Sequence, residues 1–267
     1  MAVELEPLLR ANHLDSMDRL FADDLGERLD KPGLPPWRQR RRITLQADGK
    51  SSTFFVKRFD DPPASARRQV RDAKIGARSV AGVEWSWMHR LRQDGIACAR
   101  PVALGEVVDR GKEIRSVLVS EAVPGQSLER WMSRWHELGP VKAREMALGV
   151  ARLVSRFHRK GYIHRDLYLS HVFYDATGRG DEALRLIDLQ RVIRPRWRGS
   201  RWIVKDLASL NFSAPPECFS RADRLRWLLV YLGTGKLEAA ARRLVYRVVG
   251  KTMRIRRRER RHQDVPG

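Results

Sequence analysis

The chain has 267 residues, enough for one domain or two closely joined lobes with a substantial buried core. Hydrophobic residues make up 42% of it and charged residues 32%, a globular composition that excludes an intrinsically disordered chain. Its 53 Lys and Arg against 32 Asp and Glu give a formal net charge of +21, so we expect an anionic partner: phosphates, nucleic acid or an anionic membrane surface.

The cellular compartment is predicted from the cysteines, the N-terminal residues and the longest apolar stretches. Cys98 and Cys218 lie far apart without a C-x-x-C neighbour, which argues against a disulfide framework and against a thiolate metal site. The N-terminal residues do not have the pattern of a signal peptide, and no stretch approaches the ~20 apolar residues needed to span a bilayer. We expect a cytoplasmic protein, with peripheral contact at the inner face of the cytoplasmic membrane as an option.

The first elements form an extension and a hairpin. Residues 1–38 mix helical patterning with a Pro/Gly break, Lys31-Pro32-Gly33-Leu34-Pro35-Pro36, and are interpreted as an N-terminal extension on a stiff linker. The alternating runs 41–47 and 52–59 flank Asp48-Gly49-Lys50, and an Asp-Gly pair in that position is typical of a β-hairpin.

A helix and two more strands come next. Apolar residues recur at helical spacing over 79–94, and Gly95 follows where a helix would stop. The runs 101–108 and 115–123 are predicted strands, and Pro124-Gly125 breaks the pattern after the second one.

The second half has a helical character. An apolar stripe between Met146 and Phe157 predicts a helix that ends at Gly161. Two short strands are expected at 171–175 and 184–188, with more helix from about Lys205, and the basic run 254–262 is interpreted as a solvated tail.

The tripeptide His164-Arg165-Asp166 lies between the helix and the two short strands, the second of which closes on Asp188. A kinase catalytic loop and its metal-binding carboxylate occur in this order. Phosphoryl transfer needs a carboxylate for the hydroxyl proton, a metal ion, and a cation on the nucleotide phosphates. We assign these roles to Asp166, to Asp188 with Mg²⁺, and to Lys57, although His-Arg-Asp alone would also suit an ordinary turn.

Glu84 is the predicted partner of Lys57. It lies on the apolar stripe of its helix, and Lys57 alternates with Phe55 and Phe59, so each charge points to an apolar face and is best explained by the other. The alternatives are a strand lysine whose ammonium reaches solvent and a boundary glutamate with a solvated carboxylate.

The predicted fold class is therefore α+β: a protein-kinase-like bilobal fold with a small β-rich N-lobe at 39–123 and a mostly helical C-lobe at 124–235 that holds the catalytic loop. Residues 1–38 precede it, and residues 236–267 form a basic C-terminal helix or tail. No G-x-G-x-x-G precedes Lys57, so the sequence does not identify what covers the nucleotide phosphates.

Several segments resemble the lipopolysaccharide core heptose kinase family of the Kdo/WaaP group, over about residues 39–233. They are DGKSSTFFVKRF, GARSVAGVEWSWMHRLRQDGI, VLVSEAVPGQSLE, GYIHRDLYLSHVF, LRLIDLQRV and WIVKDLASLNFSA. The resemblance implies an ATP- and Mg²⁺-dependent kinase that phosphorylates a sugar hydroxyl, most simply heptose of the lipopolysaccharide inner core. The expected partner is then an anionic glycolipid on a membrane surface, and not nucleic acid.

The resemblance also implies roles for further residues. His171 stands where protein kinases have the catalytic-loop Asn, so it is a candidate metal ligand as well as a candidate structural histidine. The hinge, whose backbone meets adenine, falls at Glu121 to Val123. In kinase-like folds an Asp in the helix after the metal carboxylate braces the catalytic loop; Asp206 resembles it, with a plain N-cap as the alternative.

Two other functions stay open at this point. One is a protein Ser/Thr kinase, although D-F-G is replaced by Asp188-Leu189-Gln190 and no A-P-E follows. The other is a basic protein that binds nucleic acid or a membrane on a degenerate kinase fold, since arginines interleave with Trp197 and Trp202.

Overall fold

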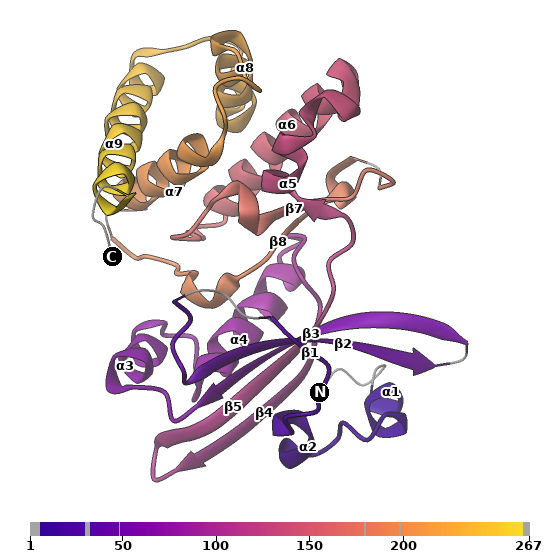
Figure 1. The fold of residues 1–267 in the computed structure, drawn as a ribbon. Helices are drawn as coiled ribbons and strands as arrows, with labels where there is room; N and C mark the ends of the chain where they lie inside the picture. Colours follow the sequence, from indigo (N-terminus) through magenta and orange to yellow (C-terminus); the bar gives the residue numbers. More distant parts are fainter. Residues whose placement is uncertain (1–5, 30–32, 48, 179, 198, 264–267) are drawn as a thin grey trace. The chain divides into compact units, whose positions relative to one another are not determined.

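The computed structural model describes residues 6–29, 33–47, 49–178, 180–197 and 199–263, and divides into two compact units. The first unit runs to Val123 and includes Asp188–Gln190; the second holds 124–187 and the residues after Gln190. Lys31 and Pro32 of the predicted linker and Asp48 of the predicted turn lie outside the described residues. Figure 1 gives the order of elements within each unit.

The first unit is built on an antiparallel five-stranded sheet in the order β1-β2-β3-β5-β4. Its strands are β1 (Glu27–Arg28), β2 (Arg38–Ala47), β3 (Lys50–Asp60), β4 (Pro101–Asp109) and β5 (Lys112–Glu121). β2 and β3 pair from Arg38 opposite Phe59 to Ala47 opposite Lys50, which confirms the predicted hairpin. Gly49 in the connection has a φ of 70°, the left-handed conformation that glycine adopts without strain.

Helices cover the sheet on both faces (Figure 1). They are α1 (Glu6–Ala11), α2 (Met17–Phe21), α3 (Ala64–Asp72) and α4 (Val80–Gln93). The predicted helix 79–94 is confirmed as α4: the Ser79 hydroxyl accepts the Gly82 N–H at its start, and Gly95 follows its last residues with a φ of 69°. Leu9, Leu14 and Leu20 of the N-terminal segment are buried in the cluster of sheet side chains around Phe54.

The second unit is mostly helical. Its helices are α5 (Leu128–Ser133), α6 (Trp135–Arg159), α7 (Gly199–Ser213), α8 (Arg221–Leu232) and α9 (Ala239–Gln263). Its strands are β6 (Gln126–Ser127), β7 (Val172–Tyr174) and β8 (Leu184–Leu186). Short 3₁₀ turns accompany them: η2 (Leu169–His171), η3 (Gly180–Ala183) and η4 (Leu189–Arg191). The turn η4 begins in the first unit and ends in the second.

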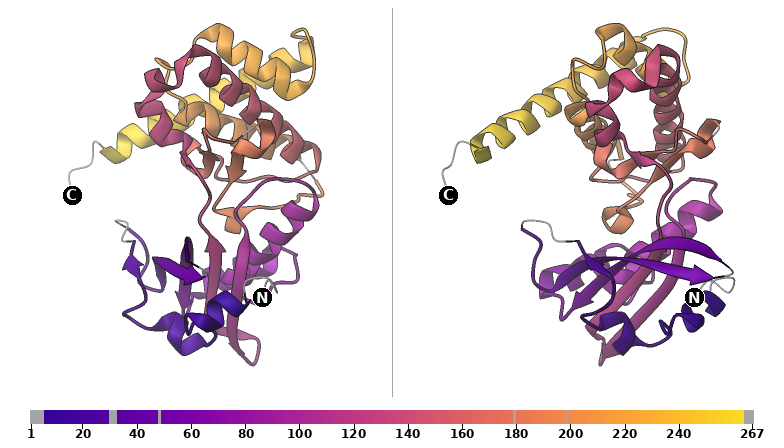
Figure 2. Two further views of the ribbon diagram at one scale, coloured as in Figure 1. Left: turned by 90° about the vertical axis from the view of Figure 1, so that its right-hand side faces the viewer. Right: turned by 45° about the vertical axis from the view of Figure 1, so that its right-hand side comes forward.

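The helix expected from about Lys205 begins earlier, at Gly199. The basic run 254–262, predicted within a C-terminal helix or tail, belongs to helix α9. α9 packs against α7, and its C-terminal half extends beyond the other helices of its unit (Figure 2). Within the described residues, the helices are too short or too polar to cross a bilayer.

Candidate functional site

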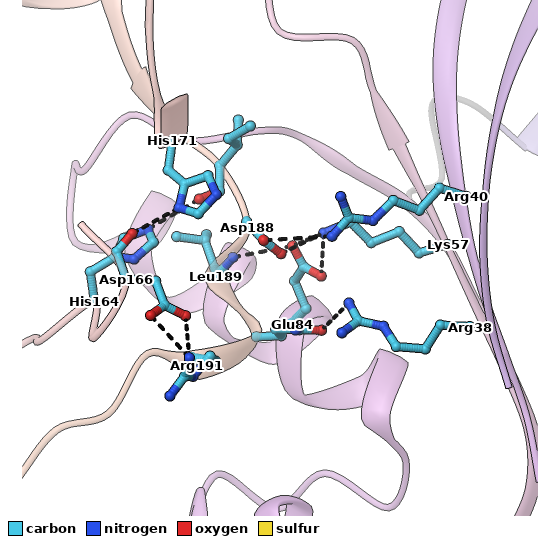
Figure 3. Close-up of polar contacts among 12 residues, drawn as sticks. Arg38, Arg40, Lys57, Glu84, His164, Asp166, His171, Asp188, Leu189 and Arg191 are labelled. Carbon is cyan, nitrogen blue, oxygen red and sulfur yellow. Dashed lines mark hydrogen bonds and ion pairs between the residues drawn. The ribbon is translucent and has the colours of Figure 1, made fainter. Parts of the chain in front are cut away.

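Lys57 lies between two carboxylates within the first unit (Figure 3). Its Nζ donates to both oxygens of Glu84, at 2.7 and 2.8 Å, and to Oδ1 of Asp188 at 3.1 Å. The Glu84 side chain is 0% exposed and also accepts the Leu189 N–H at 3.2 Å. The predicted Lys57–Glu84 pair is therefore present, and the alternative of a solvated glutamate is wrong.

Local structure explains this arrangement. β3 alternates its side chains, so Lys57 points away from the face on which Phe54 and Val56 pack against the N-terminal helices. Glu84 is held on the buried stripe of α4, where an unpaired carboxylate would be strongly unfavourable. Asp188 has a φ of 57°, a left-handed conformation that is rare for a residue with a side chain and is concentrated at functional sites.

Two arginines that the sequence analysis did not assign complete this group. Arg38 donates from Nη2 to Oε1 of Gln190 at 3.1 Å, and Nη2 of Arg40 lies 3.6 Å from Oδ2 of Asp188. Burial, followed by the charge of Arg40, lowers the pKa of Arg38. Together with Lys57, three cations share one face of the sheet with Glu84 and Asp188 (Figure 3).

The His164-Arg165-Asp166 loop lies in the second unit, after α6. Nη1 of Arg191 donates to both oxygens of Asp166, at 2.7 and 3.0 Å. Nδ1 of His171 lies 2.7 Å from the backbone oxygen of Asp166, and because a carbonyl oxygen can only accept, Nδ1 is the donor. The histidine therefore holds the catalytic loop against β7, and a structural role is present whether or not it also binds metal.

Asp206 braces this loop from α7. Its carboxylate is 0% exposed and accepts the backbone N–H groups of His164 at 2.7 Å and Arg165 at 2.8 Å, with Nε2 of His158 at 3.4 Å. Because Asp206 lies inside α7 and not at its first residues, the N-cap alternative is wrong. Arg165 has a φ of 71°, so Asp206 holds a backbone conformation that a non-glycine residue rarely adopts.

The residues predicted to contact adenine end β5. The Glu121 N–H donates to the Arg100 carbonyl at 2.9 Å, and the next residue, Ala122, donates to Thr53 at 2.9 Å. Val123 is the last residue of the first unit before Pro124. Their contact with a nucleotide stays a prediction.

Asp188 has the chemistry of a Mg²⁺ ligand. Mg²⁺ prefers oxygen and is usually held by one or two carboxylates plus substrate phosphates, so it does not need a cage of protein side chains. The described part of the chain contains no cluster of three or more His, Cys, Asp or Glu side chains suited to a metal. Lys57 contacts only Oδ1 of Asp188, at 3.1 Å, whereas it engages both oxygens of Glu84, so Asp188 fits such a site better.

Comparison with known proteins identifies related proteins. The model described as "Lipopolysaccharide kinase (Kdo/WaaP) family" matches residues 67–231. Lipopolysaccharide core heptose(I) kinase WaaP of Pseudomonas aeruginosa is 35% identical over 202 residues, 72% of this chain and 73% of that protein. The Escherichia coli K12 protein of the same name is 30% identical over 202 residues, 73% of this chain and 75% of that protein.

A solved structure, "WaaP in complex with acyl carrier protein", superposes with a TM-score of 0.68 and 28% identity, covering 93% of this chain and 96% of that chain. This likeness confirms the predicted kinase-like α+β fold.

Proposed function

Because the chain belongs to the lipopolysaccharide kinase (Kdo/WaaP) family, we propose that it transfers the γ-phosphoryl group of ATP to a hydroxyl of heptose in the lipopolysaccharide inner core. The observation that supports the kinase chemistry most directly is the pair of Lys57 with the buried carboxylate of Glu84, with Asp188 beside it. A cation fixed by a buried carboxylate is the arrangement that kinases use to hold nucleotide phosphates.

The first unit supplies the nucleotide contacts in this proposal. Lys57 binds the α and β phosphates, and Glu84 keeps its ammonium in place. Asp188 holds Mg²⁺, which neutralises charge on the phosphates. His171, a residue of the second unit, stays a separate candidate metal ligand. The backbone of Glu121 and Val123 meets adenine.

Asp166 acts on the acceptor. Its carboxylate orients the sugar hydroxyl and takes its proton as the hydroxyl oxygen attacks the γ phosphorus. The bond from that phosphorus to the β,γ-bridging oxygen breaks, and ADP leaves with its electron pair. Arg191 donates hydrogen bonds to both oxygens of Asp166 and so fixes the orientation of the carboxylate before the acceptor binds.

The acceptor is an anionic glycolipid in a bilayer, and α9 is suited to that surface. Tyr246 is 83% exposed and Met253 is 56% exposed, and both line a groove of about 750 Å³ between α7 and α9. Basic side chains share this groove: Arg201, Lys205, Arg247, Lys251 and Arg254. A helix with exposed apolar residues among basic ones lies at membrane interfaces, so we assign it the peripheral contact with anionic lipid.

Sedimentation with vesicles of phosphatidylcholine and phosphatidylglycerol tests this contact. The Tyr246→Ser/Met253→Ser double variant should bind anionic vesicles more weakly than the wild type. Val141→Ser, which alters an exposed apolar residue on α6, is the control. Equal binding of all three proteins would remove α9 from the membrane contact.

The direct test of the proposed function is mass spectrometry of lipopolysaccharide core that lacks heptose phosphate, incubated with ATP, Mg²⁺ and the purified protein. The wild type should add one phosphoryl group to heptose, and Asp166→Asn should not. Asp175→Asn changes another aspartate of the same unit, in the turn after β7, and should retain activity. If the protein bound ATP but heptose gained no phosphoryl group, the proposed nucleotide site would stand and heptose would be refuted as the acceptor.

A further inference from the structure

Three consecutive arginines in β2 have three different environments. Nη1 of Arg41 donates to two backbone carbonyls of the segment before β1, at 2.8 and 3.1 Å. Arg42 is exposed and forms an ion pair with Glu27. Arg40 differs from both, because its guanidinium lies 3.6 Å from the nearest oxygen of Asp188, beyond a good hydrogen bond.

Arg40 also stands in an unfavourable electrostatic position. It is directly opposite Lys57 in the β2–β3 register, and like charges directly opposite on neighbouring strands repel one another. Arg38, two residues earlier, points its guanidinium to the same side, toward Gln190. Glu84 and Asp188 supply two negative charges against these three positive ones, so the group keeps an excess of positive charge that suits a polyanion.

Residues 33–37, the described residues directly before β2, offer fewer backbone donors than a glycine-rich loop would. Protein kinases cover the nucleotide phosphates with a glycine-rich loop, whose backbone N–H groups point at the phosphate oxygens. Here the described residues before Arg38 are Gly33, Leu34, Pro35, Pro36 and Trp37. Two of these five are prolines, which have no N–H to donate.

We infer that Arg40, with Arg38 beside it, forms the polyphosphate-binding site of the nucleotide, taking the place of a glycine-rich loop. This inference rests on the proposed function, because it requires ATP at Lys57. The guanidinium group matches it chemically, since its planar fork of N–H donors pairs with two phosphate oxygens at once. The Arg40 guanidinium makes only a long contact with Asp188 and is partly exposed, so its terminal N–H groups are the donors available to such a ligand.

Isothermal titration calorimetry with ATP, ADP and adenosine in the presence of Mg²⁺ tests the site without relying on turnover. For Arg40→Gln we expect the affinities for ATP and ADP to fall about tenfold or more, as for the loss of a charge-assisted hydrogen bond, and the affinity for adenosine to stay unchanged. Arg40→Lys should recover only part of the loss, because an ammonium keeps the charge without the fork. Arg42→Gln, on the same strand, should bind all three ligands as the wild type does.

Each other result has a definite meaning. Equal ATP affinity for Arg40→Gln and Arg42→Gln would overturn the inference while leaving heptose phosphorylation intact. A parallel loss for adenosine would show that Arg40 only supports the fold, which also overturns it. If the wild type bound no ATP, the proposed function and this inference would fail together.

Discussion

Asp206→Asn should separate the brace of the catalytic loop from ordinary helix packing. The carboxylate accepts two short backbone hydrogen bonds, from His164 and Arg165, in a fully buried position. An asparagine keeps one acceptor oxygen but turns an NH₂ group toward the second N–H, so one charge-assisted bond is lost and a donor is left unpaired. A hydrogen bond to a charged group contributes about 1.5–3 kcal/mol, and the unpaired donor adds a further cost. We therefore expect the free energy of unfolding to fall by about 2–4 kcal/mol.

For a chain of this size, that loss lowers the Tm by roughly 4–16 °C. Activity should fall further, because the φ of 71° at Arg165 loses its anchor and Asp166 follows directly. A displacement of about 1 Å at a catalytic group can reduce the rate ~100-fold. Thermal unfolding and heptose phosphorylation measure the two effects, with the exposed Glu217→Gln as the control. A Tm and a rate equal to those of the control would refute the brace.

Three further outcomes follow from the site and from the core. Glu84→Gln should leave Lys57 with Asp188 alone and reduce ATP affinity and kcat, as measured by calorimetry and by turnover; an unchanged kcat would remove the pair from catalysis. Arg191→Gln should lower kcat about tenfold but cost less than about 1 kcal/mol of stability, since its pair with Asp166 is partly exposed; a large fall in Tm would instead show a structural role. Burial raises the pKa of Cys98 to about 12, so the folded protein at pH 8 should resist iodoacetamide at this thiol until urea unfolds it, and equal labelling of both states would contradict this.

Local signals in the sequence were sufficient for the hairpin and the main helix of the first unit. An Asp-Gly turn, a serine before an apolar stripe and a glycine after it each act over a few residues, so the hairpin β2–β3 and helix α4 were predictable. The Lys57–Glu84 pair was predictable for a related reason, because two charges on apolar faces require each other. None of these inferences needed knowledge of distant contacts.

The remaining features depend on contacts far along the chain. Arg40 looks like one more exposed arginine of a basic strand until Asp188 is brought beside it. The first turns of α7 were missed because Gly199 and the arginines around it lack an apolar stripe. The role of Asp206 was left between cap and brace, since only tertiary structure shows which N–H groups face its carboxylate.

The alternatives to a glycolipid kinase make demands that this chain meets poorly. A protein kinase binds its peptide along the segment between the metal-binding aspartate and the next helix, and here only residues 189–198 separate Asp188 from α7. A nucleic-acid-binding protein would need its basic surface but not a buried lysine–glutamate pair, which is costly to bury and serves no role in contacting a phosphate backbone. The proposed function accounts for both features, because in it Lys57 and Glu84 serve the nucleotide and the basic groove between α7 and α9 serves the anionic glycolipid.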